Sequence, residues 1–200
     1  MGKIGLMGGT FNPIHNGHLQ LAKAAYEQME LEAVWFIPNG ISYLKKDIDV
    51  LSPDVRAQMV KLAIKDIPQF SFSDIELKRK GNTYTVDTLR DLKRTYPQHQ
   101  FYFIMGADSL AFFHKWKDAD EIVKYCTILV AARDKILGPV LQECREMLEK
   151  KLNAVIQILD FELVEIASSD IRACLQKNKC LANELPPLVE AFIREHQLYQ

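Results

Sequence analysis

Two histidines stand three residues apart near the start of the chain, within the segment GGTFNPIHNGHL at residues 8–19. His15 and His18 can share one face of a helix's first turn, because residues three apart are neighbours there. Two imidazoles beside backbone N–H groups can hydrogen-bond phosphate oxygens and stabilise charge that grows in a transition state. As a zinc site the pair is incomplete, since no third ligand is obvious in the sequence. The spacing therefore favours phosphate chemistry over metal binding.

The residues just before the histidines suit the same chemistry. Gly8 and Gly9 end an apolar run, and glycine lets a backbone approach a ligand without a Cβ in the way. A strand that turns into a helix here would direct backbone N–H groups and the positive end of the helix dipole at one place. Thr10 adds a hydroxyl group. Neither G-x-x-x-x-G-K-[ST] nor G-x-G-x-x-G is present at this turn, so neither common phosphate-binding fingerprint accounts for it.

Apolar runs and amphipathic segments alternate along the whole chain. Strands are predicted over residues 3–7, 33–38, 70–77, 100–106, 126–133 and 154–159, and helices over 18–29, 52–66, 83–96, 138–152, 168–177 and 185–196. This alternation implies parallel strands joined by helical crossovers. We therefore expect an α/β fold, a Rossmann-like doubly wound parallel sheet with helices on both faces. A single domain is expected over residues 1–200, with a helical C-terminal part at roughly 168–200.

Ligands of such sheets bind beyond the carboxyl ends of the strands, where the strand order reverses. Four segments follow predicted strands and are expected to line one crevice: residues 8–18, 38–46 and 106–108, and Arg133.

Composition limits the partners that the chain can have. Its 25 basic and 26 acidic residues leave a net charge of -1, which provides no general electrostatic footprint for nucleic acid or for an anionic membrane. The four cysteines form no C-x-x-C pair, the first residues do not resemble a secretory leader, and no run approaches the ~20 apolar residues of a membrane span. We expect reduced thiols, a cytoplasmic location, and no nucleic-acid or membrane partner; a homo-oligomer is compatible with the sequence.

Two motifs at opposite ends of the chain carry a family resemblance. The H-x-G-H at residues 15–18 is similar to the signature of the nucleotidylyltransferase superfamily, and ASSDIR at residues 167–172 resembles its second motif, a serine-rich helix start that ends in arginine. Ser168 and Ser169 are good helix N-caps, and Arg172 can bind a phosphate bidentately. The chain departs from the common pattern at Asn12, where relatives often have aspartate, and at Asp170, where they often have threonine.

Within the superfamily, residues 3–199 resemble the bacterial nicotinate-nucleotide adenylyltransferases. WFIPNGISYLKK (35–46) aligns with a family segment that has P-P-H-K at residues 42–45, of which Lys45 keeps the cation. GNTYTVDTL (81–89) and MGADSLAFFHKW (105–116) are similar to segments that hold the pyridine substrate and the ATP side. By this resemblance, Trp116 stacks on the nicotinate ring, Asp108 meets a ribose and Arg133 borders the adenine. Trp35, inside a strand, is expected in the core.

The resemblance implies transfer of the adenylyl group of ATP to nicotinate mononucleotide, which yields nicotinate adenine dinucleotide (deamido-NAD) and pyrophosphate in NAD biosynthesis. Mg²⁺ would be bound through the ATP phosphates. Two alternatives are an adenylyl or cytidylyl transferase for nicotinamide mononucleotide, phosphopantetheine or another phosphate acceptor, and a non-catalytic nucleotide-sensing module. The residues implied are His15 and His18 for catalysis; Gly8, Gly9, Thr10, Phe11, Lys45, Gly106, Asp108, Arg133, Ser168, Ser169 and Arg172 for ATP; and Tyr84, Thr85 and Trp116 for nicotinate mononucleotide.

Overall fold

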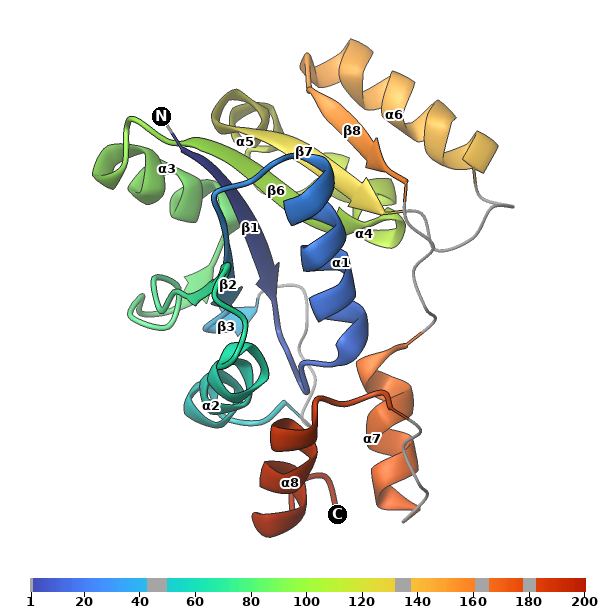
Figure 1. Ribbon diagram of the computed structural model, residues 1–200. Helices are drawn as coiled ribbons and strands as arrows, with labels where there is room; N and C mark the ends of the chain where they lie inside the picture. The colour runs from blue at the N-terminus through green and yellow to red at the C-terminus, as the bar shows by residue number, and fades with distance from the viewer. Residues whose placement is uncertain (1, 43–49, 132–137, 161–165, 178–182) are drawn as a thin grey trace.

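The structure, a computed structural model, describes residues 2–42, 50–131, 138–160, 166–177 and 183–200. Six strands form one parallel sheet with the order β4-β2-β1-β6-β7-β8 (Figure 1). Their bounds are β1 (Lys3–Gly9), β2 (Ala33–Pro38), β4 (Phe70–Phe72), β6 (Gln100–Gly106), β7 (Cys126–Ala131) and β8 (Ile156–Leu159). Two short strands, β3 (Ile41–Ser42) and β5 (Asn82–Thr83), pair separately.

Helices cover both faces of this sheet, and each face has its own buried apolar cluster. The first cluster includes side chains of α1 (Asn16–Gln28), α2 (Pro53–Ile64), α7 (Ser168–Gln176) and α8 (Pro187–Glu195). The second includes side chains of α3 (Thr85–Thr95), α4 (Ala107–Ala111), η1 (Phe113–Lys115), α5 (Ala119–Tyr125) and α6 (Gly138–Leu152). The α/β fold with a doubly wound parallel sheet is confirmed.

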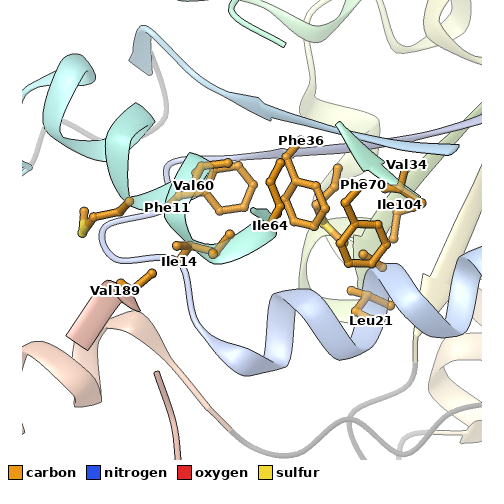
Figure 2. Close-up of a cluster of buried hydrophobic side chains, with 14 of the residues drawn as sticks. Phe11, Ile14, Leu21, Val34, Phe36, Val60, Ile64, Phe70, Ile104 and Val189 are labelled. Carbon is orange, nitrogen blue, oxygen red and sulfur yellow. The ribbon is translucent and has the colours of Figure 1, made fainter. Parts of the chain in front are cut away.

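Alternate side chains of the central strands enter opposite clusters, as a parallel sheet covered on both faces requires. In β1, Leu6 belongs to the second cluster and Met7 to the first. The first cluster also takes in two residues of the loop that follows β1, Phe11 and Ile14, beside Phe36 of β2 (Figure 2). The loop that carries the histidine motif is therefore anchored in the core.

Most predicted elements match the observed ones to within two residues at each end, and the short strands β3 and β5 were not predicted. Other differences are local. The strand predicted over 70–77 ends at Phe72, because the chain turns after it and the N–H of Lys78 bonds back to the carbonyl of Asp74. Helix α1 begins at Asn16 rather than at residue 18. The helices between residues 107 and 125 were not predicted: α4 and η1 are too short to show a helical period, and α5 has only seven residues.

The strand order reverses between β1 and β6, which places the switch point beside the histidine loop. Strand β1 stays paired with β2 as far as Gly9 and Pro38, whereas its pairing with β6 ends at Leu6 and Phe103. The two central strands thus separate toward their carboxyl ends, where ligands of such sheets bind. Helices α7 and α8 lie at the end of the sheet toward which the arrow of β1 points (Figure 1). No helix in the described ranges is long and apolar enough to cross a membrane.

Candidate active site

The two histidines meet at the beginning of α1. His15 is the N-cap residue, with an extended backbone, and its side chain is buried. Its ring lies against that of His18, with 3.7 Å between the ring centroids and 35° between the planes. The N–H of His15 donates to Nδ1 of His18 across 3.3 Å. Because Nδ1 accepts this bond, a neutral His18 carries its proton on Nε2, at the opposite edge of the ring.

The surroundings of Gly17 explain why a glycine stands between the two histidines. A Cβ at this position would lie 3.1 Å from Nδ1 and 3.2 Å from Cε1 of the His15 ring. Gly17 and His15 are both buried, so a side chain at residue 17 would force the His15 ring to shift by a few tenths of an ångström in a closely packed site. The sequence indicated the two histidines but not this steric reason for the residue between them.

Phe11 has a different place from the one expected for a phosphate contact. Phe11 is 2% exposed and its ring packs against that of Phe36, with ring centroids 6.0 Å apart (Figure 2). The same ring packs edge-on against His18. The Phe11 backbone is left-handed, with φ of 51°, so its ring folds back over Gly9, where a Cβ would meet ring carbons at 3.1 Å. The side chain of Phe11 is a core group, and only its backbone N–H can serve a phosphate. Gly9 makes room for that ring, while Gly8 is exposed.

The second motif reaches the first. Ser168 Oγ donates to the carbonyl of Pro13 across 3.0 Å, and Arg172 Nη1 donates to the carbonyl of Asn12 across 2.8 Å. The N-cap of α7 is Ala167, so the expected capping role of Ser168 is corrected. Its hydroxyl instead holds the loop between β1 and α1, residues 10–15, called the first loop below. Ser169 and Asp170 lie exposed in the first turn of α7.

Asn12 is the point where three parts of the chain join. Its side chain is buried, and its Oδ1 accepts bonds from the N–H of Leu51 at 3.2 Å and from the hydroxyl of Tyr199 at 2.9 Å. Burial raises the pKa of Tyr199, so its hydroxyl remains a donor at neutral pH. A carboxylate could accept the same two bonds. Tyr199 was missed, because nothing near it in the sequence points to the first loop.

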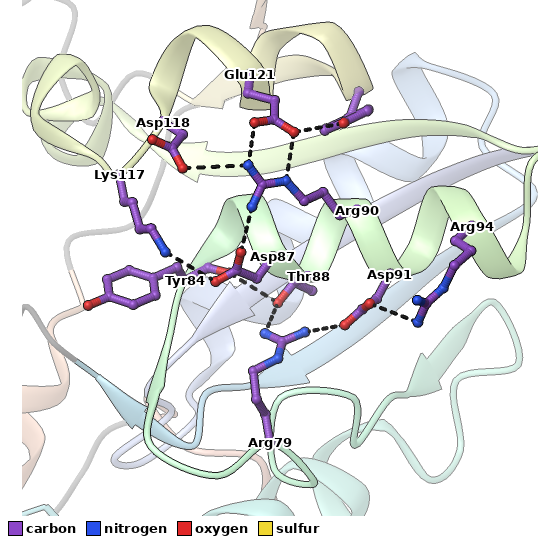
Figure 3. A network of polar contacts seen from close by, with 11 residues as sticks. Arg79, Tyr84, Asp87, Thr88, Arg90, Asp91, Arg94, Lys117, Asp118 and Glu121 are labelled. Atoms are coloured by element: carbon purple, nitrogen blue, oxygen red, sulfur yellow. Dashed lines mark hydrogen bonds and ion pairs between the residues drawn. The ribbon is translucent and has the colours of Figure 1, made fainter.

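The residues expected to hold the pyridine substrate also lie near one another. Tyr84 is the N-cap of α3, Thr85 is its first residue, and Lys117 Nζ lies 4.3 Å from the centroid of the Tyr84 ring (Figure 3). The neighbouring Trp116 is half-buried and packs edge-on against Phe103, with ring centroids 5.8 Å apart. A Cβ at Gly8 would touch the same Phe103 ring at 3.4 Å. The structure thus links Trp116 to the first motif through β6.

An ion-pair network joins the first half of α3 to Lys117 and to α5 (Figure 3). Arg90 of α3 donates to Asp87 at 2.8 Å and forms a two-pronged pair with Glu121 of α5. The hydrogen bonds from Arg90 lower the pKa of Glu121 to about 2. Lys117 Nζ is 3.6 Å from the other oxygen of Asp87. The segment after η1 is therefore tied to the first turn of α3.

Other predicted positions complete the description. Gly106 is the N-cap of α4, with open space where a Cβ would stand, and Asp108 is exposed in the first turn of that helix. Lys45 and Arg133 lie outside the described residues. Trp35, expected in the core, is only half-buried, and it packs against Tyr96 and Phe101 at the margin of the second buried cluster. In the parts of the chain that the structure describes, no group of three His, Cys, Asp or Glu side chains gathers as a metal site.

Sequence comparison relates this chain to proteins of known family. The cytidylyltransferase-like family matches residues 6–174. A protein of Lachnoclostridium phytofermentans, named a probable nicotinate-nucleotide adenylyltransferase, is 40% identical over all of both chains. A protein of Dehalococcoides mccartyi with the same name is 39% identical over 98% of this chain and 97% of its own.

Solved structures share the fold. The nicotinic acid mononucleotide adenylyltransferase of Plasmodium falciparum, complexed with NaAD, superposes with a TM-score of 0.82 over 100% of this chain and 98% of its own, at 18% identity. The same enzyme complexed with APC gives a TM-score of 0.79 with the same coverage and identity.

Proposed function

The chain belongs to the cytidylyltransferase-like family and to the nicotinate-nucleotide adenylyltransferases, and from this we propose that it joins ATP to nicotinate mononucleotide. The products are nicotinate adenine dinucleotide (deamido-NAD) and pyrophosphate, in a step of NAD biosynthesis. The observation that carries the proposal is the packing of the His15 and His18 rings against each other at the start of α1. The loop before them is held by the second motif, because Arg172 donates to the carbonyl of Asn12. Full-length relatives at 39–40% identity support the acceptor.

In the proposed reaction a phosphate oxygen of nicotinate mononucleotide attacks the α-phosphorus of ATP in line. The new P–O bond forms as the bond to the oxygen that bridges the α- and β-phosphates breaks, and that electron pair leaves with pyrophosphate. The nucleophile is already an anion, so no serine or cysteine needs activation. Catalysis then depends on positioning the reactants and on stabilising charge.

We assign the donor role to His18, whose Nε2–H is directed away from the bond that holds Nδ1. It would donate to the α-phosphate oxygens as their charge grows. His15 is buried under the same turn, and its ring packs against His18, so it orients that ring and adds a second imidazole beside the phosphate.

The triphosphate would lie against the beginning of α1 and α7. Backbone N–H groups of the first loop, the hydroxyl of Thr10 and the guanidinium of Arg172 are the proposed donors. Mg²⁺ is proposed to enter as part of the ATP complex, held by phosphate oxygens, where it neutralises part of their charge. Further proposed ATP contacts are Gly8, Gly9, Phe11 and Ser168 (both through their N–H), Lys45, Gly106, Asp108, Arg133 and Ser169.

The acceptor would bind on the α3 side of the sheet. Trp116 is proposed to stack on the pyridine ring, with Tyr84 and Thr85 at the start of α3 beside it. We propose that the chain acts as one domain in the cytoplasm, since α7 and α8 share a buried cluster with the sheet and the three described cysteines are free thiols.

The test compares acceptors. Purified protein is incubated with ATP, Mg²⁺ and nicotinate mononucleotide, nicotinamide mononucleotide or phosphopantetheine, and pyrophosphate release is measured. Nicotinate mononucleotide should give the highest kcat/KM, and His18→Ala should lower kcat by about 10²–10³. Absence of turnover with nicotinate mononucleotide would refute the proposed acceptor. Near-normal turnover by His18→Ala would refute the proposed mechanism.

A further inference from the structure

An arginine is buried directly behind the first loop. Arg56 of α2 is 1% exposed and is one of the largest fully buried side chains in the described residues. Its Nε donates to the carbonyl of Leu51 at 3.0 Å. Its Nη1 donates to the carbonyl of Thr10 at 2.7 Å and to Oδ1 of Asn39 at 3.1 Å. Its Nη2 donates to the carbonyls of Asn39 at 2.8 Å and Gly40 at 3.0 Å.

This guanidinium is unusual in both number and kind of partner. An arginine has five N–H donors in a rigid plane, and here the described residues supply five acceptors. Every one of these acceptors is an uncharged oxygen. Burial lowers the pKa of Arg56, yet arginine keeps its proton in proteins, so a full positive charge lies behind the loop. A flexible lysine could carry the charge but could not hold five oxygens in one plane.

The bonds of Arg56 join the carboxyl ends of two neighbouring strands. Thr10 is the first residue after β1, and Asn39 is the first after β2. Asn39 also bonds across this junction, because its N–H donates to the carbonyl of Gly9 at 2.9 Å and its Nδ2 donates to Oγ1 of Thr10 at 3.3 Å. The relative position of the two loops therefore depends on the Arg56 fork.

Arg56 also determines which way the loop N–H groups face. In a trans peptide the C=O and the following N–H point in opposite directions. Since the carbonyl of Thr10 faces Arg56, the N–H of Phe11 faces away from it, and the N–H of Gly40 does the same on the neighbouring loop. Phe11 has the left-handed backbone that residues with side chains rarely adopt. The bond from Arg56 to the preceding carbonyl holds that conformation.

We propose that Arg56 is a positioning residue for nucleotide binding: through the carbonyl of Thr10 it aims the N–H of Phe11 in the first loop at the ATP phosphates, and through the carbonyls of Asn39 and Gly40 it fixes the neighbouring loop beside it. Its hydrogen bonds go to the protein, so it acts through the backbone of the loop rather than on the substrate. The inference rests on the proposed function, because it takes the first loop to be the ATP phosphate site.

Two substitutions separate the geometry of the fork from its charge. Arg56→Lys keeps the charge and loses the fork, and Arg56→Met loses both. Both should weaken competitive inhibition by inorganic triphosphate at least tenfold and lower kcat/KM for ATP by ten- to a hundredfold. The KM for nicotinate mononucleotide should change less than threefold. Arg145→Lys, on the remote helix α6, is the matched control and should leave all three values unchanged.

A milder variant distinguishes the positioning of the first loop from a contribution of Arg56 to folding alone. Asn39→Ser removes one of the five acceptors, together with the bond from Asn39 Nδ2 to Thr10 Oγ1. It should shift triphosphate inhibition in the same direction, about threefold or more, with an unchanged circular dichroism spectrum. This variant keeps the test decisive if Arg56 variants do not fold. The inference is overturned if folded Arg56→Lys binds triphosphate within threefold of the parent protein, if Asn39→Ser has no effect, or if both substrates weaken equally. Failure of the proposed function is distinguishable, since the parent protein would then lack turnover whatever stands at residue 56.

Discussion

The hydroxyl of Tyr199 and the side-chain oxygen of Asn12 are hydrogen-bonded across 2.9 Å, although 187 positions separate them in the chain. Because the carbonyl of the same Asn12 accepts from Arg172, the segment after α8 and the second motif both hold the loop before the histidines. The buried oxygen of Asn12 would lose one of its donors if the Tyr199 hydroxyl were removed.

Tyr199→Phe tests this connection. The substitution should lower the free energy of unfolding by about 1 kcal/mol, the usual contribution of one such bond. It should also reduce kcat/KM several-fold, since the loop loses one of its restraints. Urea denaturation and the pyrophosphate assay measure the two effects. Tyr96→Phe, on an exposed tyrosine at the end of α3, serves as the control. Unchanged stability would show that the Asn12 bond contributes nothing.

Gly17→Ala tests the steric basis of the H-x-G-H spacing. Alanine is favoured over glycine in a helix by up to about 1 kcal/mol, so propensity alone predicts a more stable protein. The new Cβ would displace the His15 ring, which lies 3.1 Å away, and with it the stacked His18. We expect kcat to fall at least tenfold while the thermal midpoint changes little. Retention of full kcat would mean that the ring positions are not needed.

Much of this architecture follows from local sequence pattern, and the rest does not. The β1 run, the glycines and the histidines lie within one short segment, so periodicity and residue type suffice to place them at a strand–helix junction. Arg56 and Tyr199 act through contacts with parts of the chain that are distant in sequence, which no local pattern encodes. Gly17 acts through the position of the His15 ring, which only the folded structure shows. Arg56 in particular stands on an amphipathic helix, where an arginine is typical of an exposed face. Only the tertiary packing of α2 against the two loops makes it a buried group.

Lys117 is predicted to influence the choice between acid and amide acceptors. Its ammonium group lies over the Tyr84 ring, beside the residues proposed to hold the pyridine. A cation there favours the carboxylate of nicotinate mononucleotide over a neutral amide. The group is 43% exposed and also pairs with Asp87, so solvent and that carboxylate weaken the effect. Lys117→Met should reduce the ratio of kcat/KM values for the two acceptors by about two- to fivefold, less in high salt. An unaltered ratio at low salt would exclude this role.

Glu76 should make stability depend on pH in a direction opposite to that of most carboxylates. It accepts a 2.8 Å bond from Thr88, and burial raises its pKa above the ordinary value of 4.5 despite that bond. The folded protein therefore binds this proton more tightly than the unfolded chain does. The stabilisation is fully present below pH 4.5 and is lost as the pH rises through the folded-state pKa.

Glu76→Gln removes this titration while keeping a side chain of similar shape. The parent protein loses stability at this site as the pH rises from 4.5 toward 7, whereas the variant does not. The difference in unfolding free energy between the two proteins should therefore shift in favour of the Glu76→Gln variant over that range. Chemical denaturation of both proteins at several pH values measures it. A difference that stays constant with pH would contradict the buried-carboxyl interpretation, because only a group whose pKa differs between the folded and unfolded states makes stability depend on pH.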